Sequence, residues 1–241
     1  MPGTDEMIYF AHRGARGHEP ENTLRAFSRA LELGARWIEL DVYPVENELV
    51  VFHDLRLERT TNGTGFVWQQ TLEHLRLLDA GKGEVIPLLG EVFDLVGPET
   101  GINIELKRFG AAEPVARFLR QRLAHGSPGP ERWLVSSFIH SELSAFAQLM
   151  PEVRIGALTA SLPLDLARFA EELGASSVHP AIDSVNGDFV RDAHRRGLKV
   201  FVYTVNHPEE LAWMRELGVD GVFTDFPDRI PGAAETSPHG P

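Results

Sequence analysis

Short β-rich runs alternate with longer helical patterns along nearly the whole chain. Eight runs are rich in β-branched and aromatic residues, and the segments between them carry apolar residues at three- and four-residue spacing. The predicted strands are 7–12, 36–43, 102–107, 133–136, 153–158, 176–179, 199–204 and 220–224. The predicted helices include 24–33, 115–123, 142–150, 164–173, 189–196 and 209–217. Several helices end in glycine before the next strand, as at Gly34 and Gly218, which is typical of a helix-to-strand connection.

Eight strand–helix units in 241 residues predict an α/β fold, a closed TIM (β/α)8 barrel with a small insertion after the second strand. An open, doubly wound sheet is the alternative, but no Gly-x-Gly-x-x-Gly turn follows a predicted strand. The turn-rich segment of about 54–90 is too long for a strand–helix loop and forms the insertion. A single barrel domain is expected over 7–229, followed by a flexible C-terminal tail, 230–241.

Composition narrows the possible functions. The chain has no cysteine, which excludes disulfides, zinc–thiolate sites, iron–sulfur clusters and a cysteine nucleophile. It carries 35 acidic against 23 basic residues, and a formal net charge of -12 disfavours nucleic acid and anionic membranes as partners. No segment approaches the ~20 apolar residues of a membrane helix, and the acidic start lacks a signal-peptide pattern. A cytoplasmic protein without stable membrane insertion is expected, either a monomer or a homodimer.

Charged residues occupy one face of two predicted strands. Residues two apart share a face, so Glu39 and Asp41 alternate with the apolar set of the second strand, as Glu105 and Lys107 do in the third. Because the apolar faces suit the surrounding helices, these four side chains are expected to point toward the barrel axis. A hard divalent cation, Mg²⁺ or Ca²⁺, would relieve the repulsion among the three carboxylates. The alternative is ordinary pairing with Arg or Lys in a solvated loop.

Two histidines stand in comparable positions. His12 ends the first predicted strand, and His53 ends the apolar run 49–53. Two imidazoles that titrate near working pH can serve as base and acid in one reaction, and the residues do not say which is which. Arg13 and Lys107 supply the positive charge that a phosphate would need. Serine-hydrolase and P-loop chemistry are disfavoured, because neither a Gly-x-Ser-x-Gly turn nor the P-loop pattern occurs.

Nine short motifs occur in order along the chain. They are His12-Arg13-Gly14, Pro20-Glu21-Asn22-Thr23, Glu39-x-Asp41, Val51-Phe52-His53-Asp54, Thr61-Asn62-Gly63-Thr64-Gly65, Asn103-Ile-Glu105-Leu-Lys107, Ser136-Ser137-Phe138, Thr204-Val-Asn206 and Gly218-Val-Asp-Gly-Val-Phe-Thr-Asp225-Phe-Pro227. With this set, about residues 7 to 229 resemble the glycerophosphodiester phosphodiesterase family, whose fold is a TIM barrel with a small insertion after the second strand. One departure is Tyr203, where many members carry Trp, and it affects substrate preference alone.

The resemblance implies metal-dependent hydrolysis of a small-molecule glycerophosphodiester to sn-glycerol 3-phosphate and an alcohol, with water or the glycerol 2-hydroxyl as nucleophile. It implies one divalent cation, Mg²⁺ or Ca²⁺, and acid–base catalysis by two histidines. The matching positions are Glu39, Asp41 and Glu105 for the metal, His12 and His53 for acid–base catalysis, Arg13 and Lys107 for the phosphate, and Glu21 and Asn22 for the first loop of the site.

Two other functions stay open. A related enzyme would release the head group from lysophospholipids, and it would need an apolar groove at the barrel mouth or membrane attachment. Leu72, Leu75, Leu77 and Leu78 of the insertion could supply such a surface, or they could form its own small core. A barrel that only binds a partner would have lost ligands or histidines, and none is missing here.

Overall fold

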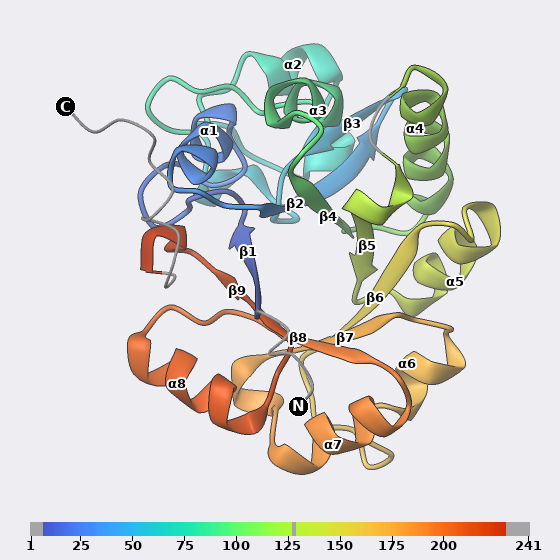
Figure 1. Cartoon of the computed structure of the whole chain (residues 1–241). Coiled ribbons are helices and arrows are strands. Elements are labelled where there is room, and N and C mark those ends of the chain that lie inside the picture. The colour runs from blue at the N-terminus through green and yellow to red at the C-terminus, as the bar shows by residue number, and fades with distance from the viewer. Residues whose placement is uncertain (1–6, 127–128, 230–241) are drawn as a thin grey trace.

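The computed structural model describes residues 7–126 and 129–229, in which strands form a ring surrounded by helices (Figure 1). The barrel strands are β1 (Ile8–His12), β2 (Trp37–Val45), β4 (Gly101–Leu106), β5 (Trp133–Ser137), β6 (Arg154–Thr159), β7 (Ser177–Pro180), β8 (Lys199–Val202) and β9 (Gly221–Thr224). The helices outside them are α1 (Leu24–Glu32), α3 (Leu89–Val96), α4 (Ala112–Ala124), α5 (His140–Leu149), α6 (Arg168–Glu172), α7 (Gly187–Arg195) and α8 (Pro208–Leu217). The tail predicted over 230–241 lies outside the described residues.

The ring closes because β1 pairs in parallel with both β2 and β9. The predicted TIM barrel with an insertion after the second strand is therefore confirmed. The register also positions polar side chains at one level. His12 on β1 is the partner of Glu39 on β2, and Asp41 on β2 is the partner of Glu105 on β4. These four residues stand at the carboxyl ends of the strands, where barrel enzymes carry their chemistry.

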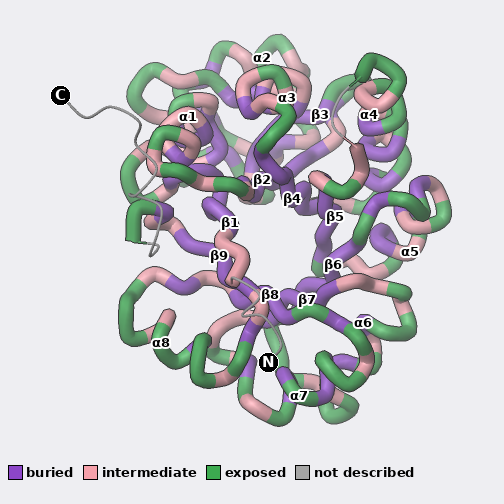
Figure 2. The backbone as a smooth tube through the Cα atoms, in the orientation of Figure 1, coloured by how far each residue is buried: buried purple, intermediate pink, exposed green. Residues whose placement is uncertain are grey.

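The strands are buried on both faces, whereas the outer faces of the helices are exposed (Figure 2). Ile38, Leu40 and Val42 of β2 pack outward against the helices, within a core that runs around the whole barrel. The side chains that alternate with them point inward. Apolar inward residues form a cluster at the amino-terminal end of the barrel, whereas the charged inward residues lie at the other end.

The first loop and α1 are joined by a close backbone approach. The hydroxyl of Thr23 accepts a hydrogen bond from the amide of Ala26 and so caps the first turn of α1. Gly14 has φ of 78°, and a Cβ there would lie 2.6 Å from the carbonyl carbon of Ala26. Only glycine fits this position. The turn thereby fixes Arg13, which has φ of 53°, at the mouth of the barrel.

The insertion begins with a hairpin that the sequence analysis did not separate from its neighbours. β2 continues past its predicted end and pairs in antiparallel fashion with β3 (Glu48–Val51). The chain then forms η1 (Leu57–Arg59), η2 (Val67–Gln69) and α2 (Leu72–Arg76). Leu75 and Leu78 are buried in a separate small core, whereas Leu77 is 77% exposed. The insertion's leucines mainly form its own core, and the domain boundaries 7–229 stay a prediction.

One helix is shorter than its periodicity indicates. The segment 164–173 carries helical spacing, yet α6 begins only at Arg168. Leu166 has φ of 54°, in the left-handed region, which interrupts a right-handed helix. Within the two described ranges, none of the helices combines the length and apolarity that crossing a membrane requires.

Candidate active site

Three carboxylates meet at the carboxyl end of the barrel. Glu39, Asp41 and Glu105 each offer an oxygen, and these oxygens lie within 4.8 Å of one another. All three residues are buried, Asp41 completely. The alternation seen in the sequence places them on the inward face, and the β2–β4 register brings them to one level. The structure thus brings together the full set predicted for a metal.

The electrostatics of this cluster are strained. Burial, with repulsion from neighbouring carboxylates, holds the pKa of Glu39 well above its usual value. Burial likewise raises the pKa of Glu105 to about 7, although Lys107 opposes the shift. Burial acts in the same direction on Asp41, but Lys107 and Arg13 outweigh it and lower its pKa to about 2. Two of these neighbouring buried carboxylates thus have raised pKa values and the third has a lowered one. A hard cation bound among them would stabilise the charged form of all three.

The cluster also leaves an acceptor unused. Among the described residues, Asp41 Oδ1 accepts no hydrogen bond, although Lys107 Nζ lies 3.3 Å away. Buried polar atoms normally have partners, so this oxygen is suited to a further ligand. Oxygen donors without thiolate or imidazole in the set favour Mg²⁺ or Ca²⁺ over zinc. The residues present therefore fit a hard divalent cation.

The two cations predicted for phosphate lie against the same carboxylates. Lys107 Nζ lies 2.7 Å from Glu105 Oε1, and Arg13 Nε lies 3.4 Å from Asp41 Oδ2. The backbone amide of Arg13 also donates to Glu39 Oε2 at 2.9 Å. Burial acts to lower the pKa of Lys107, but Asp41 and Glu105 raise it above its usual value. Both groups therefore stay positively charged at neutral pH.

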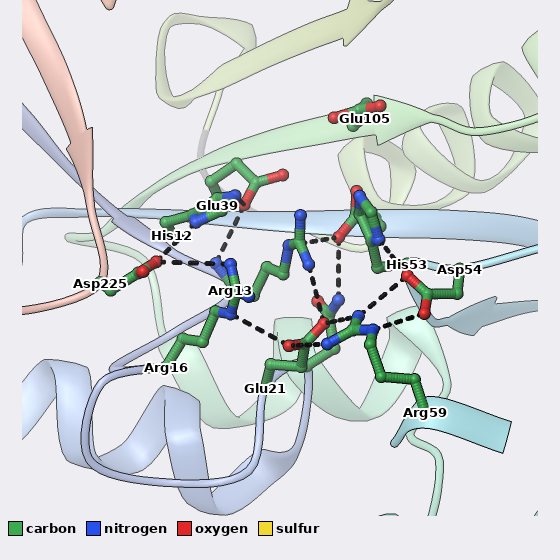
Figure 3. A network of polar contacts seen from close by, with 12 residues as sticks. His12, Arg13, Arg16, Glu21, Glu39, His53, Asp54, Arg59, Glu105 and Asp225 are labelled. Atoms are coloured by element: carbon green, nitrogen blue, oxygen red, sulfur yellow. Dashed lines mark hydrogen bonds and ion pairs between the residues drawn. The ribbon is translucent and has the colours of Figure 1, made fainter. Parts of the chain in front are cut away.

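In each predicted histidine, Nδ1 lies within hydrogen-bonding distance of an aspartate. His12 Nδ1 lies 2.7 Å from Asp225 Oδ1, and His53 Nδ1 lies 2.6 Å from Asp54 Oδ1. Burial lowers the pKa of both rings, although the hydrogen bonds that the two aspartates accept act to raise it. Figure 3 shows the two pairs on opposite sides of Arg13. In both rings the second nitrogen, Nε2, remains available for proton transfer.

Glu21 and Asn22 make their hydrogen bonds and ion pairs with protein groups. Glu21 Oε1 lies 2.8 Å from Arg13 Nη1 and 2.6 Å from Arg59 Nη2, and its Oε2 lies 3.0 Å from Arg16 Nε. Asn22 Nδ2 donates to Asp41 Oδ2 at 2.8 Å. These contacts place the two residues behind the carboxylates, where they hold charged groups in position. A contact with substrate stays a prediction.

A cavity of about 150 Å³ joins these groups. Charged and apolar side chains both line it, and one of them, Tyr203, donates its hydroxyl to the Thr159 carbonyl. The lining residues are His12, Arg13, Glu39, His53, Asn103, Glu105, Ser136, Phe138, Leu158, Tyr203 and Phe223. The arrangement can bind an anion beside a hard cation and move protons on two sides of it.

Sequence reasoning gave no role to the groups that support the histidines. Asp225 and Asn206 lie in quoted motifs, and Asp54 directly follows His53, but their partners depend on barrel closure and on the insertion. Arg59 of η1 contacts both Asp54 and Glu21. Adjacency to a histidine was a signal for Asp54. A 213-residue separation between His12 and Asp225 gave none.

A model of the glycerophosphoryl diester phosphodiesterase family matches residues 12–229. The chain belongs to this family. It is therefore an enzyme, a phosphodiesterase of the glycerophosphoryl diester class. The match begins at the end of β1 and ends with η5 (Pro227–Arg229), so it includes every group described above.

Relatives within the glycerophosphoryl diester phosphodiesterase family match over nearly their whole length. A glycerophosphodiester phosphodiesterase of Caldanaerobacter subterraneus subsp. tengcongensis is 37% identical over 239 residues, covering 93% of this chain and 96% of the relative. One from Bacillus altitudinis is 40% identical over 233 residues, covering 91% and 95%. The structure of an Oleispira antarctica phosphodiesterase in complex with the product sn-glycerol-3-phosphate has a TM-score of 0.86 and 31% identity, and covers 94% of this chain and 96% of that one.

Proposed function

We propose that the enzyme hydrolyses glycerophosphodiesters to sn-glycerol 3-phosphate and an alcohol, with one divalent cation held by Glu39, Asp41 and Glu105. The observation that carries this proposal is a cluster of three buried carboxylates, two of which line one cavity together with two imidazoles that each face an aspartate. The Oleispira antarctica structure supports the choice of product, because that phosphodiesterase was solved with sn-glycerol-3-phosphate.

The cation would be Mg²⁺ or Ca²⁺, bound through the unused oxygen of Asp41 and one oxygen from each glutamate. When bound, it supplies positive charge to the phosphate oxygens and so favours attack on an anionic phosphorus. Arg13 and Lys107 add two fixed positive charges at the same point, which stabilise the charge that the phosphoryl oxygens gain in the transition state.

The two histidines would divide the proton transfers. One takes a proton from the nucleophile, which is water or the glycerol 2-hydroxyl, and the other gives a proton to the departing alcohol. Their Nδ1 atoms face aspartates, so both transfers use Nε2. His12 and His53 lie on opposite sides of Arg13 (Figure 3), which suits attack and departure on opposite sides of a phosphate.

The decisive test measures release of glycerol 3-phosphate from glycerophosphocholine and glycerophosphoethanolamine, with and without EDTA. EDTA should abolish the activity, and added Mg²⁺ or Ca²⁺ should restore it. The Glu39→Gln variant should be inactive even with the cation present. Glu113→Gln on the outer face of α4, whose side chain is 61% exposed, is the matched control and should behave as the unmodified enzyme. Activity that survives both EDTA and Glu39→Gln would contradict the metal's role.

The same assay with a lysophospholipid of equal head group separates the alternative substrate class. The buried positions of Leu75 and Leu78 leave Leu77 as the one strongly exposed leucine of the four considered for an apolar surface. We therefore expect faster turnover of the deacylated diester. A cytoplasmic location and a monomeric or homodimeric state remain part of the proposal.

A further inference from the structure

The carboxylate that holds His12 comes from the opposite end of the chain. Asp225 directly follows β9, and its Oδ1 lies 2.7 Å from His12 Nδ1 at the end of β1. The pairing of β1 with β9 brings the two together, with Ala11 opposite Thr224. His12 is buried, and the Asp225 side chain is 16% exposed, so water competes weakly for this hydrogen bond.

Asn206 holds Asp225 in turn through two hydrogen bonds. Its Nδ2 donates to Asp225 Oδ2 at 2.9 Å, and its Oδ1 accepts from the Asp225 backbone amide at 2.9 Å. The backbone amide of Asn206 donates to Glu210 Oε2 in the first turn of α8. The result is a chain of contacts from α8 through Asn206 and Asp225 to the His12 ring.

The support of His53 differs in chemistry. Arg59 contacts Asp54 with two nitrogens, Nε at 2.5 Å from Oδ2 and Nη2 at 2.9 Å from Oδ1. A guanidinium therefore neutralises the aspartate behind His53. Behind His12 the close partner is the neutral amide of Asn206, and the nearest guanidinium nitrogen, on Arg16, lies 3.8 Å from Asp225.

We propose that Asp225 is a positioning residue that, held by Asn206, fixes the His12 ring with its proton on Nδ1 and presents an unprotonated Nε2 to the cavity. His12 Nε2 lies 4.0 Å from Glu39 Oε2, on the carboxylate side of the site. The inference rests on the proposed function, in which His12 transfers a proton. A carboxylate only accepts hydrogen bonds, so the ring nitrogen facing it must carry the hydrogen.

The isosteric substitution Asp225→Asn tests this directly. Asn206 Nδ2 would continue to donate to the side-chain oxygen, which turns the new NH₂ group toward His12. Nδ1 must then accept, and the ring proton moves to Nε2. The substitution keeps shape and volume but reverses the tautomer. In this inference His12 is the base of the proposed reaction, and it would lose the Nε2 lone pair that accepts the proton.

The experiment records histidine-ring ¹⁵N spectra of the Mg²⁺-supplemented enzyme, with the His12 signals identified by their loss in His12→Gln. We expect a protonated Nδ1 in the unmodified enzyme and a protonated Nε2 in Asp225→Asn, with kcat reduced about 10²–10⁴-fold and KM changed less than about threefold. The matched control is Asp228→Asn, since Asp228 Oδ1 binds His18 Nε2 at 2.7 Å on the exposed surface. It should leave kcat unchanged.

If Asp225→Asn does not fold, a second variant, Asn206→Ala, still tests the inference. Asn206→Ala keeps the carboxylate but removes both side-chain bonds to it, and kcat should fall about tenfold while Nδ1 stays protonated. An unchanged kcat in Asn206→Ala, or an unchanged tautomer in Asp225→Asn, overturns the inference. Full activity in His12→Ala would instead overturn the proposed function, and the tautomer measurement, which needs no substrate, would still report on Asp225.

Discussion

The two ends of the barrel interior are built from the same strands with opposite chemistry. At the amino-terminal end Phe10, Leu134, Phe201 and Phe223 form an apolar cluster, here called the floor. At the other end the three carboxylates, His12 and His53 form what we call the mouth. On β1, Phe10 of the floor and His12 of the mouth are two residues apart on one face. β1 therefore contributes a core residue at one end of the barrel and a residue of the candidate active site at the other.

The floor is packed as a protein core should be. Phe10 stacks on Phe223 with ring centroids 4.5 Å apart and contacts Phe201 and Trp37 at 5.1 and 5.4 Å. The mouth, in contrast, holds carboxylates whose pKa values are raised by burial and mutual repulsion. The comparison shows that burying the carboxylates of the mouth lowers the stability of the folded protein. The packed floor and the outer core offset this cost, because they stabilise the strands that carry the site.

A third inward histidine sharpens the comparison. His179 on β7 is completely buried beside the floor, with its ring 5.4 Å from Phe201 and 5.2 Å from Phe223. Burial lowers its pKa to about 3, and its close polar partner is the hydroxyl of Ser177 rather than a carboxylate. It therefore stays neutral. Burial alone makes a structural histidine, and an aspartate at Nδ1 makes one suited to proton transfer.

The largest effect should come from removing an imidazole of the mouth. His12→Ala should reduce kcat about 10²–10⁴-fold, because it removes a proton-transfer group, and it should change the free energy of unfolding by less than about 1 kcal/mol. Steady-state kinetics with a chemical-denaturation curve measures both. His53→Ala should give the same pattern. Near-normal turnover in either variant would contradict its acid–base role.

The complementary change lies two residues away in the floor. Phe10→Ala should lower the free energy of unfolding by about 3–5 kcal/mol, because it leaves a cavity among three aromatic rings. Folded protein should retain its KM. Leu164→Ala is the control, since Leu164 is fully exposed and should change stability by less than about 0.5 kcal/mol. Loss below 1 kcal/mol for Phe10→Ala would show that the floor does not carry stability.

A smaller effect on stability is expected when a divalent cation binds at the mouth and reduces the repulsion among its carboxylates. Mg²⁺ or Ca²⁺ at 100 times its dissociation constant should raise the free energy of unfolding by about 2.7 kcal/mol, measured by thermal melting. Glu105→Gln should abolish this response and should leave the cation-free protein at least as stable, because a repelled buried carboxylate is gone. Glu113→Gln should keep the full response. An unchanged response in Glu105→Gln would contradict its role as ligand.

The smallest effect concerns the ion pairs beside the mouth. Hydrogen bonds and charges from Arg59 and Arg13 outweigh burial and lower the pKa of Glu21 to about 2, against 4.5 for the free side chain. Its contribution to stability is therefore complete above pH 4.5 and is lost as pH falls toward 2. Glu21→Gln should reduce the loss of unfolding free energy between about pH 7 and about pH 3 by about 2 kcal/mol. An identical acid limb would show that these pairs contribute nothing.

The fold and the chemical groups were predictable because they depend on local periodicity. Alternation along two strands indicated that Glu39, Asp41 and Glu105 face inward, and glycine caps separated the strand–helix units. The β2–β3 hairpin was not predicted, and in it Pro44 pairs with Leu49 although proline is uncommon in strands. The support of His12 was missed because it joins residues 213 apart, which periodicity does not encode. Asp54, in contrast, adjoins His53 in the sequence, and its role was missed despite that signal.

The seam between β1 and β9 has a consequence for biosynthesis. Asp225 is translated 213 residues after His12. A nascent chain that still lacks β9 already contains the three carboxylates and both imidazoles, but His12 has no aspartate to orient its ring. The aspartate that orients the His12 ring therefore comes into place only after β9 has been translated and has paired with β1.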